Sequence, residues 1–236
     1  MCSGGDASAH LSEIADAGDP RVAEVARLLQ RTFADPNTVL GEDRMREFLT
    51  DRRASRFHIL VAESDRVVVG CSVFSYVPAS RCGFSEYLVV DQSLRKTGLG
   101  RQLFDARKAI LDNDAEGACR GLFIEVDSPV RTPPELLAAE TMDARERLRI
   151  FTHLGFRKVD LSYVQPPLRP AGETVDYLDL LFAPWTPLRL NQIPSTWVLQ
   201  TLEVIWSAWA PQTYATYLVQ LRQQIGDTEV RLLDAE

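Results

Sequence analysis

The sequence lacks any apolar run long enough to span a membrane. No stretch of its 236 residues approaches the ~20 consecutive apolar residues of a membrane-spanning helix. The first residues, Met1 to Asp6, have neither a basic start nor an apolar run, so no secretory signal is expected. With 45% apolar and 25% charged residues, the composition is ordinary for a globular protein. We therefore expect a cytoplasmic protein with no membrane partner.

Cysteine and positive charge are also scarce. The four cysteines, Cys2, Cys71, Cys82 and Cys119, form no Cys-x-x-Cys pair, and no His, Cys and carboxylate cluster has the spacing of a metal site. Cys71 and Cys119 lie in apolar runs and are expected to be buried free thiols. The formal net charge of −7 argues against nucleic acid as a partner, because phosphate backbones are bound by basic surfaces. It is compatible with a cationic substrate.

What the sequence does contain is an ordered series of strand-like and helical patterns. Runs rich in β-branched and aromatic residues predict strands at 11–15, 57–62, 67–76, 83–90, 122–126, 159–164 and 175–182. Apolar residues at helical spacing predict helices over 20–33, around 45–49, after 98, and over 142–153. Gly155 ends the last of these. The order predicts an α/β (α+β) fold, a mixed and mostly antiparallel central sheet flanked by helices.

The composition changes after residue 183. Prolines punctuate the remainder, and apolar positions that include Trp197, Trp206 and Trp209 predict two further helices. About 50 residues rarely form a stable core alone, so we predict a domain over 1–183 and a C-terminal helical extension over 184–236. The aromatic side chains of the extension require burial, either on the core or in a homodimer.

A loop with two glycines joins the strand at 83–90 to the next helix. Gly98 and Gly100 lie at the start of that helix, where glycine lets the backbone approach a ligand closely. Unpaired N–H groups and the helix dipole favour a phosphate there. Arg95, Lys96 and Arg101 add positive charge to an otherwise acidic chain. The loop therefore predicts a diphosphate site, and the alternative is that its glycines serve tight packing alone.

The spacing excludes two common phosphate motifs. The chain has no Gly-x-x-x-x-Gly-Lys-Ser/Thr run, which a P-loop requires. In a dinucleotide fingerprint a third glycine would stand where this chain has Leu103.

Two motifs resemble those of a known family. Arg95-Lys96-Thr97-Gly98-Leu99-Gly100 matches the Arg/Gln-x-x-Gly-x-Gly/Ala signature of the GNAT superfamily of N-acetyltransferases. The run from Ile150 to Val159, with its Leu-Gly-Phe turn, resembles the late helix and following strand of that family. The resemblance covers roughly residues 10–183. It implies the acyl-CoA N-acyltransferase fold, acetyl-CoA as co-substrate, and acetyl transfer to a primary amine of a small molecule or peptide by direct attack in a ternary complex.

The resemblance also implies a set of cofactor-binding residues. The main-chain amides expected to hold the pyrophosphate, with two arginines beside them, are those of Lys96, Thr97, Gly98, Leu99 and Gly100, flanked by Arg95 and Arg101. Leu88, Val89 and Val90 are expected to bind the pantetheine arm through main-chain hydrogen bonds, as an added strand would. Phe151 is expected to cover the sulfur end, and the strand of Glu125 to splay from that of Val89.

Two carboxylates are candidates for proton transfer. In many relatives a carboxylate on the strand before the glycine loop is the general base, and such a base contributes about 10²–10⁴-fold. Here the candidate is Glu86, which alternation places on one face with Phe84 and Leu88. The usual acidic position aligns with Phe84, so this role is shifted by two residues, and the alternative is a surface charge at a sheet edge. Glu125 lies in an apolar run, where a carboxylate is paired or functional, and is the candidate to bind or deprotonate the amine.

Phe151 departs from the family pattern. Relatives usually have a tyrosine at this position, whose hydroxyl protonates the leaving thiolate, whereas phenylalanine has no proton to give. Tyr163 on the next strand is a candidate for this role, and the alternative is that the thiolate leaves unaided. The departure keeps a second hypothesis open, a non-catalytic acyl-CoA-binding module whose aromatic tail binds a partner protein.

Overall fold

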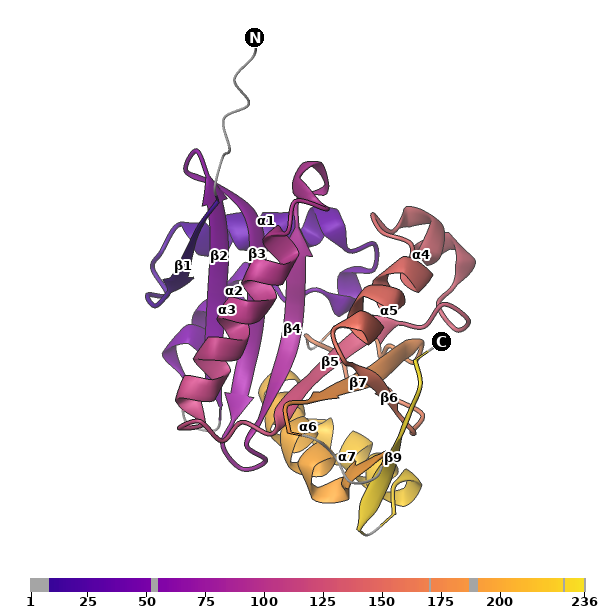
Figure 1. The fold of residues 1–236 in the computed structure, drawn as a ribbon. Coiled ribbons are helices and arrows are strands. Elements are labelled where there is room, and N and C mark those ends of the chain that lie inside the picture. Colours follow the sequence, from indigo (N-terminus) through magenta and orange to yellow (C-terminus); the bar gives the residue numbers. More distant parts are fainter. Residues whose placement is uncertain (1–8, 52–54, 170, 187–190, 227, 236) are drawn as a thin grey trace.

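The computed structural model describes residues 9–51, 55–169, 171–186, 191–226 and 228–235; Cys2 lies outside them. In this part of the chain nine strands form one sheet, in the order β1-β2-β3-β4-β5-β7-β6-β9-β8 (Figure 1). The strands are β1 (His10–Ile14), β2 (Arg56–Ser64), β3 (Val67–Val77), β4 (Cys82–Val90), β5 (Gly121–Asp127), β6 (Arg157–Val159), β7 (Leu178–Pro184), β8 (Gln192–Pro194) and β9 (Glu229–Leu233). Every pairing is antiparallel except that of β4 with β5, so the predicted fold class is confirmed.

Helices cover both faces of the sheet (Figure 1). They are α1 (Arg21–Thr32), α2 (Glu42–Thr50), α3 (Leu99–Asp114), α4 (Pro134–Ala139), α5 (Ala144–His153), α6 (Ser195–Trp209) and α7 (Tyr214–Gln224), with short 3₁₀ turns η1 (Pro36–Thr38) and η2 (Gln92–Leu94). The apolar residues of α3 and α5 form one core with one face of the sheet. Those of α1, α2 and α6 form a second core on the other face.

The sheet opens between β4 and β5. These strands pair only where Gly83 to Ser85 meet Leu122 to Ile124, and beyond that point they diverge (Figure 1). The main-chain groups of one edge of β4 are therefore left without a neighbouring strand. This is the splay that the resemblance implied.

A β-bulge at Glu86 changes the faces of β4. Phe74 of β3 pairs with Ser85, whereas Val73 pairs with Tyr87, so Glu86 is the extra residue. The prediction that Phe84, Glu86 and Leu88 share one face is therefore wrong for Leu88. Phe84 packs in the core of α1, α2 and α6, whereas Leu88 packs against the core of α3 and α5.

The closing strands also differ from their predicted bounds. β6 ends at Val159, where the expected strand over 159–164 was to begin, because the chain turns back through a hydrogen bond from Leu161 N to Val159 O of 2.8 Å. Val175 forms only an isolated bridge with Gln165, and β7 covers Leu178–Pro184. Between them, Tyr163 is buried in the core rather than placed on a strand.

The C-terminal segment packs on the core of the same chain. Trp206 and Trp209 of α6 are 2% and 4% exposed, and the Trp209 ring contacts Phe84 of β4 in an edge-on arrangement with centroids 5.5 Å apart. The segment also adds β8 and β9 to the sheet through pairing of β9 with β6, which the helical prediction for 184–236 did not include. The division at residue 183 itself stays a prediction.

Two further expectations concern cysteines and membranes. Cys71 and Cys119 are buried free thiols, as predicted, and so is Cys82. None of the helices in the described ranges has the length and apolarity needed to cross a membrane.

Candidate active site

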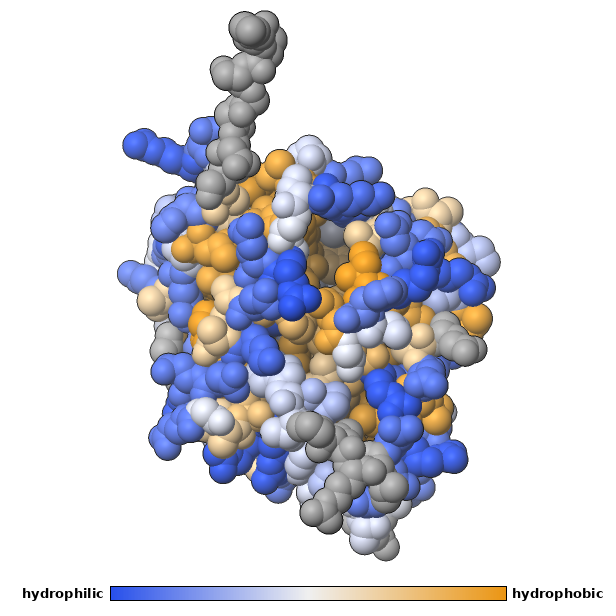
Figure 2. All heavy atoms as spheres, viewed as in Figure 1, coloured by the Kyte–Doolittle hydropathy of each residue, from blue (hydrophilic) through white to orange (hydrophobic). Residues whose placement is uncertain are grey.

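A cavity of about 610 Å³ occupies the opening between β4 and β5. Its walls come from β4 and β5, from the end of α1, and from the segment that leads into α5. In the space-filling view the surface is hollowed between α3 and α5, and apolar side chains gather there (Figure 2). The volume lies within the ~300–1,000 Å³ range of ligand pockets.

The glycine loop forms one end of this cavity. The five main-chain N–H groups of Lys96 to Gly100 have no hydrogen-bond partner among the described residues. Lys96 and Gly98 have positive φ angles of 66° and 91°, and left-handed residues of this kind occur in the backbone concavities that bind anions. Because α3 begins at Leu99, its unpaired first turn and dipole add to the same effect. The arrangement is chemically suited to an anion.

The two glycines of the loop have different structural roles. Gly98 is the N-cap of α3 and has a left-handed conformation, which costs other residues about 1–2 kcal/mol. Gly100 has helical geometry, and a Cβ there would meet only Val90 Cγ2, at 3.7 Å. No residue in the described ranges therefore requires glycine at position 100, whereas a ligand lying against the helix start would.

The charged side chains predicted around this loop are placed unevenly. Arg95 lines the cavity, but its guanidinium is bonded to Thr141, with Nη2 to Oγ1 at 2.8 Å. Lys96 lines it and is exposed. Arg101 is paired with Asp105 on the outer surface of α3, at 2.9 Å. Arg101 is therefore absent from the cavity wall.

The three remaining loop residues predicted to bind the cofactor are not among the residues that line the cavity. Thr97 and Gly98 are exposed beside the cavity. The Leu99 side chain is 4% exposed and belongs to the core of α3 and α5. Leu99 can therefore offer a ligand only its main chain, and the hydroxyl of the exposed Thr97 donates to Leu94 O at 2.7 Å.

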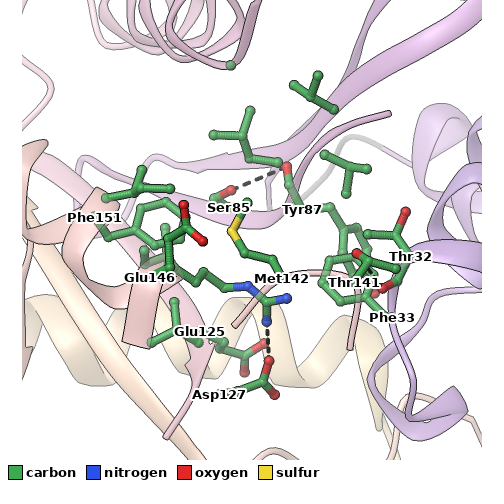
Figure 3. Close-up of a pocket in the computed structure, with 18 of the residues that line it drawn as sticks. Thr32, Phe33, Ser85, Tyr87, Glu125, Asp127, Thr141, Met142, Glu146 and Phe151 are labelled. Atoms are coloured by element: carbon green, nitrogen blue, oxygen red, sulfur yellow. Dashed lines mark hydrogen bonds and ion pairs between the residues drawn. The ribbon is translucent and has the colours of Figure 1, made fainter. Parts of the chain in front are cut away.

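Leu88, Val89, Val90 and Phe151 all line the cavity. Asp91 N donates to Val69 O at 2.8 Å, and main-chain groups alternate between the two sides of an antiparallel strand. Val89 therefore faces β3, while Leu88 and Val90 turn their main-chain groups to the opening. The ring of Phe151 packs edge-on against Phe156, with centroids 5.4 Å apart, at the side of the cavity formed by α5 (Figure 3).

Glu86 lies at the bulge and is not a surface charge. Its Oε1 accepts a hydrogen bond from Ser75 Oγ at 2.8 Å, and its Oε2 is buried with no partner in the described structure. Desolvation raises the pKa of Glu86 to about 8, against the smaller lowering effect of the Ser75 hydrogen bond. The buried Arg107 of α3, which donates to Ser85 Oγ, also lowers it. A carboxyl with a pKa near neutrality can both accept and release a proton.

Glu125 faces the cavity from β5, opposite β4 (Figure 3). The Tyr163 hydroxyl donates to Glu125 Oε1 and accepts from Trp206 Nε1 at 3.3 Å. Desolvation raises the pKa of Glu125 to about 8, although the Tyr163 hydrogen bond lowers it. The structure thus joins two predicted residues, Glu125 and Tyr163, with one from the C-terminal segment.

The predicted role of Tyr163 as a direct proton donor does not fit this geometry. Tyr163 is 1% exposed and is not among the residues that line the cavity. It lies behind Glu125 because the chain turns inward after β6. Any effect of its hydroxyl on the cavity therefore passes through Glu125.

A buried ion-pair network at the cavity was not predicted. Arg147 of α5 pairs with Asp127 of β5 (Figure 3) and with Glu140, at 2.6 Å. Glu140 Oε1 also accepts from Ala34 N at 2.8 Å. The network ties the end of α1 and α5 to β5 across the opening. In the sequence, the only sign was the acidic Asp127 at the end of an apolar run.

Comparisons with known proteins bear on the family and on the fold. Residues 22–133 match the sequence model of the acetyltransferase (GNAT) family, whereas no curated protein sequence matches the chain. A putative GNAT-family acetyltransferase from Bacteroides thetaiotaomicron has a similar structure, with a TM-score of 0.51 and 18% identity over 91% of this chain and 96% of that one. This likeness shows the acyl-CoA N-acyltransferase fold.

Two other solved structures are similar at lower scores. The ribosomal-protein-S18-alanine N-acetyltransferase from Escherichia coli has a TM-score of 0.49 and 13% identity, over 76% of this chain and 96% of that one. A GNAT family acetyltransferase from Elizabethkingia anophelis, solved with acetyl-CoA bound, has a TM-score of 0.47 and 14% identity, over 75% of this chain and 98% of that one.

Proposed function

Because residues 22–133 belong to the acetyltransferase (GNAT) family and the chain has the acyl-CoA N-acyltransferase fold, we propose that the protein is an N-acetyltransferase that transfers the acetyl group of acetyl-CoA to a primary amine. The observation that carries the proposal is the row of five unpartnered N–H groups from Lys96 to Gly100 at the end of the cavity. They suit a diphosphate because they are consecutive donors without a protein partner at the start of a helix, where Gly100 leaves room.

The residues of the cavity fit the parts of acetyl-CoA. The diphosphate is assigned to the amides of the glycine loop with Lys96, and the pantetheine arm to the open main-chain groups of Leu88 and Val90. Acetyl-CoA supplies the acetyl group as a thioester. Phe151 covers the sulfur end from α5.

Glu86 is assigned as the general base. Amine attack forms a C–N bond and breaks the C–S bond, the nitrogen loses one proton, and the thiolate gains one. Glu86 takes the proton from nitrogen, and Glu125 binds the amine from the opposite strand. Because Phe151 has no proton and Tyr163 lies behind Glu125, the thiolate is protonated through Glu125 or by solvent.

The C-terminal segment bears on the alternative of a non-catalytic binding module. That hypothesis requires aromatic surface for a partner protein, but Trp206 and Trp209 are packed into the core of their own chain. Their burial favours the enzyme. A homodimer through α6 and α7 stays a prediction, and sedimentation of the purified chain tests it.

Two measurements on the purified full-length chain test the proposed function. Acetyl-CoA raises the melting temperature, as a ligand selective for the folded state must, and thiol is released when primary amines are added. Stabilisation by acetyl-CoA with no thiol release from any amine would support the binding module instead. An unchanged melting temperature would contradict both.

A further inference from the structure

A buried arginine of α3 lies beside the bulge that carries Glu86. Arg107 is fully buried, and its Nη1 donates a hydrogen bond to Ser85 Oγ. The Nε and Nη2 atoms of Arg107 are buried without a partner among the described residues. A buried charge is destabilising unless it is paired. Packing alone therefore does not explain why an arginine stands at this position.

The hydrogen bond to Ser85 fixes the guanidinium next to the bulge. Ser85 lies on the wall of the cavity between β4 and β5 (Figure 3) and directly precedes Glu86. The Ser85 hydroxyl also reaches across the bulge to Tyr87 O, at 3.5 Å. Through this one hydroxyl, Arg107 contacts the strand on both sides of Glu86.

Arg107 and Glu86 have opposite charges, and each has buried polar atoms without a partner. Glu86 Oε2 has no donor in the described part of the chain, although Ser75 Oγ donates to Oε1 at 2.8 Å. Burial raises the pKa of Glu86 and lowers that of Arg107, and the attraction between the two charges opposes burial at both groups. The guanidinium stays protonated at neutral pH, because the ordinary pKa of arginine is above ~12.

The titratable groups on the cavity side of Glu86 supply no positive charge. Besides burial, the charge of Glu125 on β5 raises the pKa of Glu86. Tyr87 follows Glu86 on β4, and its hydroxyl donates to Thr38 O at 2.8 Å. Burial raises the pKa of Tyr87 well above its ordinary value, so this group is neutral. An ionised Glu86 therefore needs a cation from elsewhere.

The charged groups on the α2 side of Glu86 do not supply that cation. Arg44, Glu47 and Asp51 line a cavity that Glu86 also borders. Arg44 is paired with Glu47, which offsets its charge, and Asp51 has the same sign as Glu86 and so opposes its ionisation. Among the residues that the structure describes, the cation that favours an ionised Glu86 is thus Arg107.

We propose that Arg107 is a positioning residue for the general base: its charge stabilises the ionised form of Glu86, and its bond to Ser85 holds the bulge that presents this carboxyl to the cavity. This inference rests on the proposed function and adds a residue to its mechanism. α3 then acts at two points. Its first turn offers N–H groups to the diphosphate, and Arg107, about two turns later, acts on the base.

Carboxyl-carbon NMR titration of the full-length chain without CoA measures the ionisation of Glu86, and Glu86→Gln identifies the signal. In Arg107→Met the pKa of Glu86 should rise by about one to three units, because a nearby opposite charge lowers it by that amount. Arg107→Gln is a second neutral variant, which carries the test if Arg107→Met does not fold. Arg107→Lys keeps the charge and should restore a pKa near that of the wild type.

The matched control is Lys108→Met. It removes a positive charge from the next position of α3, where the ammonium lies over the Trp185 ring at 5.2 Å. The pKa of Glu86 should be the same in this variant as in the wild type.

Kinetics provide an independent readout. With the pKa of Glu86 raised by one unit or more, kcat of Arg107→Met at pH 7 should be at least about tenfold below that of the wild type. The difference should shrink as the pH rises to 10, while KM for acetyl-CoA stays the same. A residue that only supports the fold would instead lower kcat by the same factor at every pH.

Two results would overturn the inference without touching the proposed function. One is a pKa of Glu86 that is unchanged or lowered in the neutral variants. The other is an equal rise in Arg107→Lys and Arg107→Met, which would mean that the shape of the side chain matters and its charge does not. Absence of thiol release by the wild type with any primary amine contradicts the proposed function itself, and the NMR titration still decides whether Arg107 acts on Glu86.

Discussion

Replacement of Glu86 by glutamine tests the assignment of the base. The change keeps the shape of the side chain and its hydrogen bond from Ser75, but it removes the group that accepts a proton. We expect kcat to fall by about 10²–10⁴-fold, the usual contribution of a general base, which corresponds to about 2.7–5.4 kcal/mol of barrier. CoA affinity should change little, because Glu86 lies away from the glycine loop.

The pH dependence of kcat is a second, quantitative test of Glu86 as the general base. A base with a pKa of about 8 is roughly one tenth ionised at pH 7 and nine tenths at pH 9, since each pH unit is a tenfold change. The wild-type kcat, measured at saturating amine, should therefore rise about tenfold between these values. Glu125 has a pKa of about 8 as well, so Glu125→Gln is needed to divide the rise between the two carboxyls.

Thiol release followed with a disulfide reagent, from pH 6 to pH 10, is the assay. Burial raises the pKa of Cys71 and Cys82 to about 12, so these thiols add little background. The matched control is Glu203→Gln, which makes the same chemical change at an exposed carboxylate of α6 and should leave the profile intact. A Glu86→Gln enzyme that keeps its kcat and its pH rise would refute the assignment.

The structure also predicts the direction of the effect of three further substitutions. Gly100→Ala should keep or raise the melting temperature of the free protein, because alanine is about 1 kcal/mol better than glycine in a helix and a Cβ meets only Val90 at 3.7 Å. The same variant should show a smaller rise in melting temperature when CoA is added. Tyr163→Phe should raise the pKa of Glu125 further, by about one to two units, because a hydrogen bond to a charged group is worth about 1.5–3 kcal/mol; a carboxyl-carbon NMR titration measures it. Glu86 and Glu125 have folded-state pKa values raised from 4.5 to about 8. The stability that they contribute is therefore fully present below about pH 4.5 and is lost as the pH rises to 8. The loss is at most about 1.4 kcal/mol per pH unit for each group. Melting curves of Glu86→Gln/Glu125→Gln should lose this component, and an unchanged slope would contradict it.

Local sequence patterns were sufficient to predict most of the fold and the loop that forms the proposed diphosphate site. The strand up to Val90, the glycines at 98 and 100, and the helix after them are adjacent in sequence, so their periodicity and backbone preferences were enough. β9 was missed although Val230 and Leu232 alternate with polar residues, because a five-residue strand carries little signal beside two stronger helices.

The properties that depend on distant partners could not be predicted in this way. The bulge at Glu86 arises from the register of β4 against β3, which no local pattern specifies. The inward placement of Tyr163 depends on the turn after β6 and on Trp206, which is 43 positions away in the chain. A separate cavity of about 300 Å³ is lined by residues of α2, of three strands and of α6, so its composition is visible only once the chain is folded.

The most direct test of the proposed diphosphate site is a crystal structure of the full-length chain grown with CoA. We expect the diphosphate oxygens to accept hydrogen bonds from the main-chain N–H groups between Lys96 and Gly100, with the pantetheine arm beside Leu88 and Val90. CoA bound with its diphosphate elsewhere, or with side chains of the protein occupying those five donors, would contradict the proposal.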